Sequence, residues 1–149
     1  MFFLNKKKLK PSVNRNKFNV ISTSPYLIIL DTNFIYFSLK NKINLFQGLS
    51  ACLSSLYIPF IPECVASEIR KLGPKFKTAL ECIKDRRIVK YKCNHLYKTI
   101  YADNCIENIV KHFKCFMVAT CDLKLKKRLR TLSKLPIISI RKKSFFLEI

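Results

Sequence analysis

The stretch YLIILDTN at residues 26–33 decides the fold class. Its first five residues form a continuous apolar run between Pro25 and Asp31. Such a run is typical of a β-strand that is buried on both faces, as strands of parallel sheets are. Further short apolar runs of the same character lie at 56–61, 115–119 and 136–140, with a weaker one at 88–91. The sequence therefore predicts a parallel sheet built from these segments.

Helical segments fill the gaps between the apolar runs. We expect Asn44 to cap the first helix, and Gly73 with Pro74 to end the second, because Gly accepts a left-handed backbone and Pro cannot continue a helix. Strands that alternate with helices of this length predict an α/β fold, with helices on both faces of a parallel sheet. The predicted helices span residues 45–53, 62–73, 76–85, 102–111 and 122–133.

The charge of the chain is strongly positive. Of its 149 residues, 29 are Lys or Arg and 9 are Asp or Glu, which gives a formal net charge of +20. Because 49% of the residues are hydrophobic, the chain can bury a core and is not a disordered basic tail. A cationic surface attracts RNA, DNA or anionic membranes. The alternative is the codon bias of an A+T-rich genome, which favours Lys, Asn, Ile and Phe without selection for binding.

The two parts of the chain and its cysteines narrow the function classes further. Residues 1–25 are basic and irregular, so we expect an extended arm, followed by one domain over residues 26–149. The first residues lack the pattern of a signal peptide, and no apolar run is long enough to span a membrane. The seven cysteines lie within apolar segments, which indicates reduced thiols inside a cell. We therefore expect no membrane partner.

Four of the few acidic residues lie at predicted strand ends or on the helices that follow. Asp31 and Asp122 each follow a buried strand, Asp103 begins a helix, and Glu68 lies on the helix after the second strand. Sites in open parallel sheets form at the carboxyl ends of the strands. Four carboxylates brought together repel one another unless a cation lies among them. Oxygen ligands without imidazole favour Mg²⁺ or Mn²⁺, and two such ions can promote phosphodiester hydrolysis.

Each of these acids also has a purely structural explanation. Asp122 and Asp103 could each cap the helix that follows, and Glu68 could pair with Lys71 on an exposed helix face. The occurrence of all four at equivalent points of the predicted topology favours a shared metal site.

Four short motifs carry a resemblance to a known family: LDTN at 30–33, VASEIRKLG at 65–73, YADNC at 101–105 and VATCD at 118–122. Together they resemble PIN-domain nucleases, and more narrowly the rRNA-processing PIN endonuclease of the eukaryotic small-subunit processome. The likeness extends from about Tyr26 to the C-terminus. Asn104 departs from it, because relatives commonly carry a second Asp at that point.

The resemblance implies a PIN-like, Rossmann-like fold and divalent-metal-dependent cleavage of pre-rRNA during small ribosomal subunit maturation. It also implies action in the nucleolus of the nucleus, with small-subunit processome proteins and a snoRNP as partners and no small-molecule substrate. We expect Asn33 and Thr120 to orient carboxylates or water. A noncatalytic PIN-like RNA-binding scaffold of the same assembly is the alternative, against which the retained acids argue. The residues that match the acidic positions of the family are Asp31, Glu68, Asp103 and Asp122.

A second candidate metal site involves cysteine and histidine. Cys93 and His95 precede the fourth predicted helix, Cys105 lies within it, and Cys115 starts the following strand. These residues match a tetrahedral structural Zn²⁺ site, with His112 as a rival to Cys115 for the fourth position. The resembling family keeps cysteines and a histidine in this region. The alternative is that Cys105 and Cys115 only pack in the core, as we expect for Cys52, Cys64, Cys82 and Cys121.

The last predicted helix is rich in basic residues. Because it begins at the proposed acidic site, its basic face could guide an RNA backbone across the metals. A solvated face is the alternative. The candidate RNA-binding residues are Lys124, Lys126, Lys127, Arg128 and Arg130.

Overall fold

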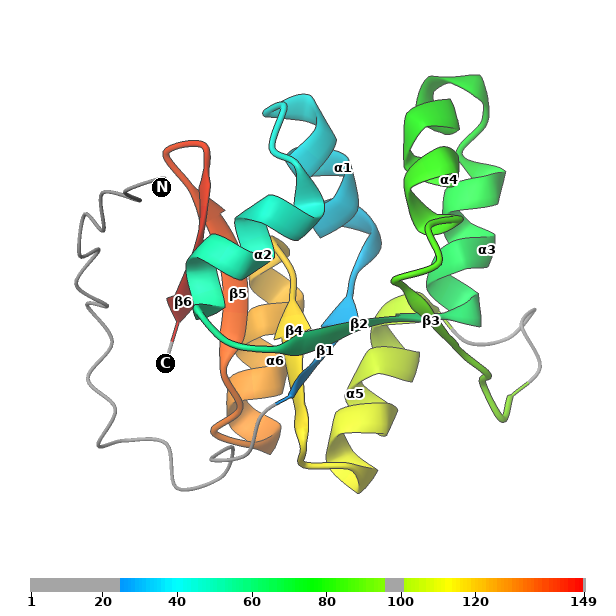
Figure 1. Cartoon of the computed structure of the whole chain (residues 1–149). Helices are drawn as coiled ribbons and strands as arrows, with labels where there is room; N and C mark the ends of the chain where they lie inside the picture. Colours follow the sequence, from blue (N-terminus) through cyan, green and yellow to red (C-terminus); the bar gives the residue numbers. More distant parts are fainter. Residues whose placement is uncertain (1–24, 96–100, 149) are drawn as a thin grey trace, which may run out of the picture.

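A six-stranded sheet forms the centre of the fold, with strand order β3-β2-β1-β4-β5-β6 (Figure 1). The computed structural model describes residues 25–95 and 101–148, so the predicted basic arm lies outside the described residues except for Pro25. Neighbouring strands run parallel except for β5 and β6. The strands are β1 (Tyr26–Leu30), β2 (Tyr57–Pro62), β3 (Val89–Tyr91), β4 (Phe116–Ala119), β5 (Ile137–Arg141) and β6 (Ser144–Glu148).

Strand β1 lies in the middle of the sheet and pairs with β2 on one side and β4 on the other. Ile28, Ile29 and Leu30 are at most 1% exposed, which confirms the prediction of a strand buried on both faces. In the β1–β4 register Leu30 lies opposite Ala119. The residues that follow these two strands therefore leave the sheet side by side, at the point where the strand order reverses and where sites form in such sheets.

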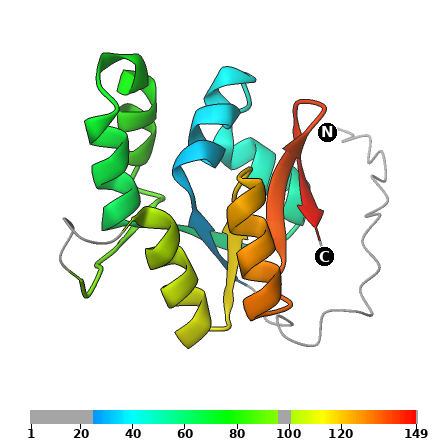
Figure 2. The ribbon, with the colours of Figure 1, turned by 180° about the vertical axis from the view of Figure 1, so that it is seen from behind.

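Helices cover both faces of this sheet. Helix α2 lies on the face toward the viewer in Figure 1, whereas α5 and α6 lie on the opposite face, in front in Figure 2. This arrangement confirms the predicted α/β class. No helix in the described ranges is long and apolar enough to cross a bilayer. The helices are α1 (Thr32–Lys40), α2 (Leu45–Leu53), α3 (Glu63–Lys71), the 3₁₀ turn η2 (Pro74–Phe76), α4 (Lys77–Ile83), α5 (Ala102–His112) and α6 (Leu123–Leu132).

Two helix boundaries follow the predicted local signals. The side chain of Asn44 accepts a hydrogen bond from the backbone N–H of Gln47 at 3.0 Å and so caps α2, as predicted. Helix α3 ends before Gly73, whose φ of 81° is a left-handed conformation that glycine adopts without strain. Asn44 thus sets where α2 begins, and Gly73 sets where the chain leaves α3 and enters η2.

Two elements were not predicted from the sequence. Helix α1 follows β1 directly, with Asp31 as its N-cap and Phe34 buried in the core. Strand β6 turns back on β5 through Lys142 and Lys143, and Phe145 packs on Phe34 with ring centroids 4.7 Å apart. The sheet is therefore parallel with one antiparallel edge strand, and not parallel throughout.

Candidate functional site

Asp31 is a buried carboxylate at the carboxyl end of β1. It is 2% exposed. Its Oδ1 accepts a hydrogen bond from the backbone N–H of Thr32 at 2.8 Å, and its Oδ2 accepts one from the hydroxyl of Thr120 at 2.7 Å. Burial raises the pKa of Asp31 to about 7, and the neighbouring Asp103 and Glu68 add to the rise, while the two hydrogen bonds oppose it. This carboxylate carries its charge at neutral pH only at an energetic cost, which a nearby cation would remove.

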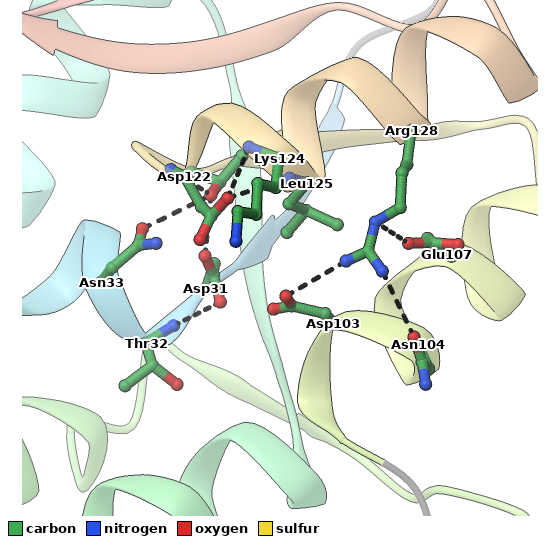
Figure 3. Close-up of polar contacts among 11 residues, drawn as sticks. Asp31, Thr32, Asn33, Asp103, Asn104, Glu107, Asp122, Lys124, Leu125 and Arg128 are labelled. Carbon is green, nitrogen blue, oxygen red and sulfur yellow. Dashed lines mark hydrogen bonds and ion pairs between the residues drawn. The ribbon is translucent and has the colours of Figure 1, made fainter.

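Three further acids share this end of the sheet. The side chains of Asp31, Asp103 and Asp122 point toward one space between the starts of α1, α5 and α6 (Figure 3). Burial raises the pKa of Asp103, and the negative charges of Asp122 and Glu68 raise it further. Glu68 is exposed on α3 and accepts a hydrogen bond from the hydroxyl of Thr32. The structure thus brings the four predicted acids to one edge, where they influence one another electrostatically.

The capping explanation holds for one acid and fails for another. Asp122 is the N-cap of α6, because its Oδ1 accepts hydrogen bonds from the backbone N–H groups of Lys124 and Leu125 at 2.7 and 2.9 Å. Both bonds use the same oxygen, so Oδ2 takes no part in the cap. Asp103 lies within the first turn of α5, whose N-cap is Tyr101. Capping therefore uses one oxygen of Asp122, just as it uses Oδ1 of Asp31 at the start of α1, and it does not account for Asp103.

Asn33 and Thr120 connect the ends of β1 and β4. The Thr120 hydroxyl donates to Asp31 and accepts from the backbone N–H of Asp122 at 3.1 Å. The side-chain oxygen of Asn33 accepts from the backbone N–H of Cys121 at 3.0 Å. Ser139 on β5, which the sequence did not single out, donates its hydroxyl to the Thr120 carbonyl at 3.1 Å. These bonds fix the backbone and one oxygen at the base of the acidic site.

The donor set of this acidic site fits a hard divalent cation. It consists of carboxylate oxygens, and Mg²⁺ and Mn²⁺ prefer oxygen ligands. The buried Asp31 with its raised pKa is the feature that a cation would stabilise in the ionised form. A site of this kind can position and activate water for attack on a phosphodiester.

The basic residues of α6 fall into three groups. Arg128 donates a hydrogen bond to Asp103 at 3.1 Å, its Nε forms an ion pair with Glu107 at 2.6 Å, and its guanidinium also lies 3.5 Å from the side-chain oxygen of Asn104 (Figure 3). Lys126 is 7% exposed and pairs with Glu148 of β6 at 2.8 Å, and Arg130 pairs with the same carboxylate. The prediction that all five bind RNA is therefore wrong for the buried Lys126, whose charge is used within the fold. Lys124 and Lys127 remain exposed on this helix.

A thiol–imidazole cluster lies beside the acidic site. One ligand atom from each of its members lies within 4.8 Å of all the others. The Cys64 sulfur lies 3.1 Å from the Cys93 sulfur and 3.0 Å from His95 Nε2, and the sulfurs of Cys93 and Cys105 are 3.5 Å apart. Three thiols and one imidazole fit the ligand set of a structural Zn²⁺ site. We call this group, Cys64, Cys93, His95 and Cys105, the thiol cluster.

The fourth member of the cluster corrects the sequence prediction. Cys115 is exposed, and exposed His112 lies 2.8 Å through Nδ1 from the backbone oxygen of Asn108, so neither belongs to the cluster. Cys64, predicted only to pack, takes that place. The reason is the β2–β3 register, which pairs Pro62 with Tyr91 and so brings the residues two positions beyond each to the same level. The predicted packing role is confirmed for Cys52, Cys82 and Cys121, which contact the core.

Burial raises the pKa of two thiols of the cluster. It raises the pKa of Cys105 to about 12 and raises that of Cys64 as well, and the adjacent thiols act in the same direction on Cys64. Without a cation the thiols of Cys64 and Cys105 stay protonated at neutral pH. A metal ion would have to displace their protons, as zinc does when it binds cysteine.

Comparisons with known proteins identify the family to which this sequence is similar. The Fcf1 family model matches residues 51–149. The rRNA-processing protein fcf1 of Schizosaccharomyces pombe is 45% identical over 124 residues, which cover 83% of this chain and 64% of that protein, so the chain spans slightly less than two thirds of that relative. The rRNA-processing protein FCF1 of Saccharomyces cerevisiae is 36% identical over 153 residues, covering 96% of this chain and 80% of that protein.

A solved structure supports the same fold. The structure of the PIN domain endonuclease Utp24 aligns with a TM-score of 0.79 at 44% sequence identity and covers 83% of this chain and 92% of that chain. This similarity confirms the prediction of a PIN-like fold.

Proposed function

This chain belongs to the Fcf1 family of rRNA-processing proteins, and on that premise we propose that it is a divalent-metal-dependent endoribonuclease that cleaves pre-rRNA during small ribosomal subunit maturation. The observation that carries the proposal is the buried Asp31 with Asp103, Asp122 and Glu68 around it. A noncatalytic scaffold has no use for carboxylates concentrated beside a polyanion, because they repel its phosphates. The acids therefore favour catalysis over scaffolding.

The four acids have one role in this proposal, which is to bind the metal ion. A bound Mg²⁺ or Mn²⁺ supplies Lewis-acid activation of water and stabilises the leaving oxygen. Asp31, Glu68, Asp103 and Asp122 would hold the ion. Thr120 keeps Asp31 in one orientation by donating to its Oδ2, and the Thr32 hydroxyl does the same for Glu68. Hydrogen bonds of this kind to a metal-binding carboxylate set the direction of its oxygens.

Basic residues beside the acids would hold the substrate. Lys124 and Lys127 are exposed on α6, whose N-cap is Asp122, so a phosphate backbone bound to them would pass the acidic site. Arg128 neutralises part of the charge of Asp103. The substrate we propose is pre-rRNA, with processome proteins and a snoRNP as partners in the nucleolus, in line with the rRNA-processing relatives.

For the thiol cluster we propose a structural Zn²⁺. Cys64, Cys93, His95 and Cys105 supply four protein ligands, and a structural zinc site is closed in this way, whereas a catalytic one keeps a position open for water. The cluster is therefore assigned to the stability of the fold and not to the reaction.

Cleavage of a pre-rRNA fragment by the full chain in Mn²⁺ tests this function. Asp31→Asn and Asp103→Asn each remove one carboxylate charge from the site. We expect each to reduce cleavage by more than about 100-fold, which exceeds the usual effect of losing a hydrogen bond to a metal ligand. Asp85→Asn is the matched control, because Asp85 pairs with Arg87 outside the site. This variant should cleave the fragment like the parent. Equal cleavage by all the proteins would refute the assigned site, and a parent that binds the fragment without cutting it would favour the scaffold.

A further inference from the structure

Three aromatic rings gather on the surface between α1 and the turn η2. The ring of Tyr36 lies 5.3 Å from that of Phe37 and 5.2 Å from that of Phe76, measured between centroids. Tyr36 is 36% exposed and Phe37 is 37% exposed, and neither belongs to the buried core. The ammonium of Lys40 lies 6.0 and 5.9 Å from the centroids of these two rings. We call Tyr36, Phe37, Phe76 and Lys40 the aromatic surface.

Both segments that build the aromatic surface begin at the acidic site. Helix α1 starts directly after Asp31, and Tyr36 lies one turn beyond Thr32 on the same face of the helix. Four residues of helix advance by about 6 Å, which corresponds to about two stacked nucleotides. Helix α3 carries Glu68 and leads through Gly73 to Phe76. Figure 1 shows α1 and the α3–α4 pair extending in the same direction from the sheet.

The two segments that carry these rings are basic along the sequence between Glu68 and Glu81 and after Asp31. Residues 32–44 and 69–80 contain no Asp or Glu. A surface that joins exposed rings to cations without acids matches the chemistry of single-stranded nucleic acid, whose bases stack on aromatic rings while its phosphates meet basic groups. The basic residues of the two segments are Lys40, Lys42, Arg70, Lys71, Lys75 and Lys77.

We propose that the aromatic surface is a stacking platform for single-stranded RNA that enters or leaves the acidic site. The inference rests on the proposed function and adds the path of the substrate. A base stacks on the exposed part of Tyr36 or Phe37, and Lys40 meets a phosphate of the same strand. Stacking of this kind tolerates any base, so the platform holds the strand without selecting a sequence.

Phe113 provides a matched control for this proposal. It is 51% exposed, more than Tyr36, and it follows the C-terminal end of α5. Strand β4 runs from beside Phe113 to Ala119 before the acidic edge is reached, so Phe113 lies at the opposite end of the sheet. An effect of ring removal that is general to exposed aromatics should appear at both positions.

Binding of the full chain to a fluorescein-labelled oligouridylate without added Mg²⁺ or Mn²⁺ tests the platform. We expect Tyr36→Leu to weaken binding about 10-fold, since stacking on one ring contributes on this order, and to leave the salt dependence unchanged. Tyr36→Phe keeps the ring and should bind like the parent, as should Phe113→Leu. Lys40→Gln should lower the slope of log K against log salt concentration by about 0.7, the value for one phosphate of a single strand.

Several outcomes would overturn the platform. Parent-like RNA affinity of Tyr36→Leu would refute it and would leave this surface to a protein partner. Equal losses in Tyr36→Leu and Tyr36→Phe would also refute it, because a stacked ring is then not the cause. Thermal melts of each variant identify loss of fold. The proposed catalysis is judged separately, because a parent that cuts no RNA while Tyr36→Leu loses affinity would refute cleavage and support the platform.

Discussion

The acidic site and the thiol cluster use the same two helices for opposite purposes. Helix α3 carries Cys64 and Glu68 one turn apart, and α5 carries Asp103 and Cys105 two residues apart. The thiols of Cys64 and Cys105 are buried, whereas Glu68 is exposed and Asp103 is half-buried. Each helix thus carries a buried thiol and an acid that is open to solvent, and the two lie on opposite faces of α5 but one turn apart on the same face of α3.

The two groups of candidate ligands also differ in whether their ligand atoms are bonded to other parts of the protein. In the thiol cluster the ligand atoms contact one another within 4.8 Å, so one ion would satisfy all of them. In the acidic site one oxygen of Asp122 caps a helix and both oxygens of Asp31 accept hydrogen bonds. The cluster can therefore close around one ion, whereas hydrogen bonds from the rest of the protein hold Asp31 and Asp122 in place.

The largest effect is expected from breaking the thiol cluster. Cys64→Ser removes a proposed zinc ligand on α3 that lies beside Cys93 and His95 after β3. If zinc binds there, the unfolding free energy should fall by about 4 kcal/mol or more, as for other lost metal sites. Zinc content per chain and chemical denaturation measure the two effects. Cys115→Ser is the control, because Cys115 is exposed outside the cluster. Unchanged zinc content in Cys64→Ser, or zinc loss in Cys115→Ser, would contradict the assignment.

An opposite effect is expected at the acidic site. The pKa of Asp31 is raised to about 7 from 3.8, so without divalent cation the folded state binds more protons than the unfolded state between about pH 4 and pH 7. Stability from this residue is then fully present below pH 4 and is lost as the pH rises through 7. Asp31→Asn should therefore stabilise the cation-free protein by at most about 4 kcal/mol at pH 8, less what the lost hydrogen bond from Thr120 costs, and hardly at all at pH 4.

Addition of Mn²⁺ should reverse that order. Saturating Mn²⁺ stabilises the parent, because an ion that binds only the folded state raises its stability by mass action, and Asp31→Asn should gain less. Melting temperatures at pH 8 and pH 4, with and without Mn²⁺, check both parts. A variant that melts below the parent at pH 8 in the absence of Mn²⁺ would show that Asp31 is not a destabilised carboxylate.

The smallest effect is expected from the exposed link between α5 and α6. Arg128 pairs with Asp103 and Glu107, but its side chain is 42% exposed, and pairs of this exposure contribute little. Arg128→Gln and Glu107→Gln should each cost about 1 kcal/mol or less, with a coupling of about 0.5 kcal/mol in the double variant. Lys127→Gln, one residue earlier and exposed, should be neutral. Additive costs would mean that the Arg128–Glu107 pair does not form in solution.

The sequence predicted the strands well because buried parallel strands are local apolar runs. It missed α1 because the segment TNFIYFSLK is rich in aromatic and β-branched residues, which are poor helix formers, although Asp31 in front of it is a capping signal. It missed β6 because the turn between β5 and β6 uses Lys142 and Lys143 with positive φ. Turns with positive φ usually contain Asn or Gly, which make them recognisable in a sequence.

Strand order alone was enough to predict that the acids meet at one edge of the sheet. The membership of the thiol cluster depends on pairing between distant segments, and the sequence did not reveal it. Asp31 and Asp122 follow strands that are neighbours in the sheet, so their meeting needed only the strand order. Cys64 joins Cys93 through the register of β2 and β3, and no local spacing such as C-x-x-C reveals this. Lys126 was assigned to RNA because its partner Glu148 lies on β6, the strand that was not predicted.

We propose that the chain holds two metal sites of different chemistry on shared helices. Anomalous diffraction from crystals of the full chain soaked in Mn²⁺, recorded at the zinc and manganese absorption edges, tests it most directly. We expect a zinc peak among Cys64, Cys93, His95 and Cys105, and a manganese peak among Asp31, Glu68, Asp103 and Asp122. Crystals with no manganese peak among the four acids, or with no zinc in the thiol cluster, would contradict the account.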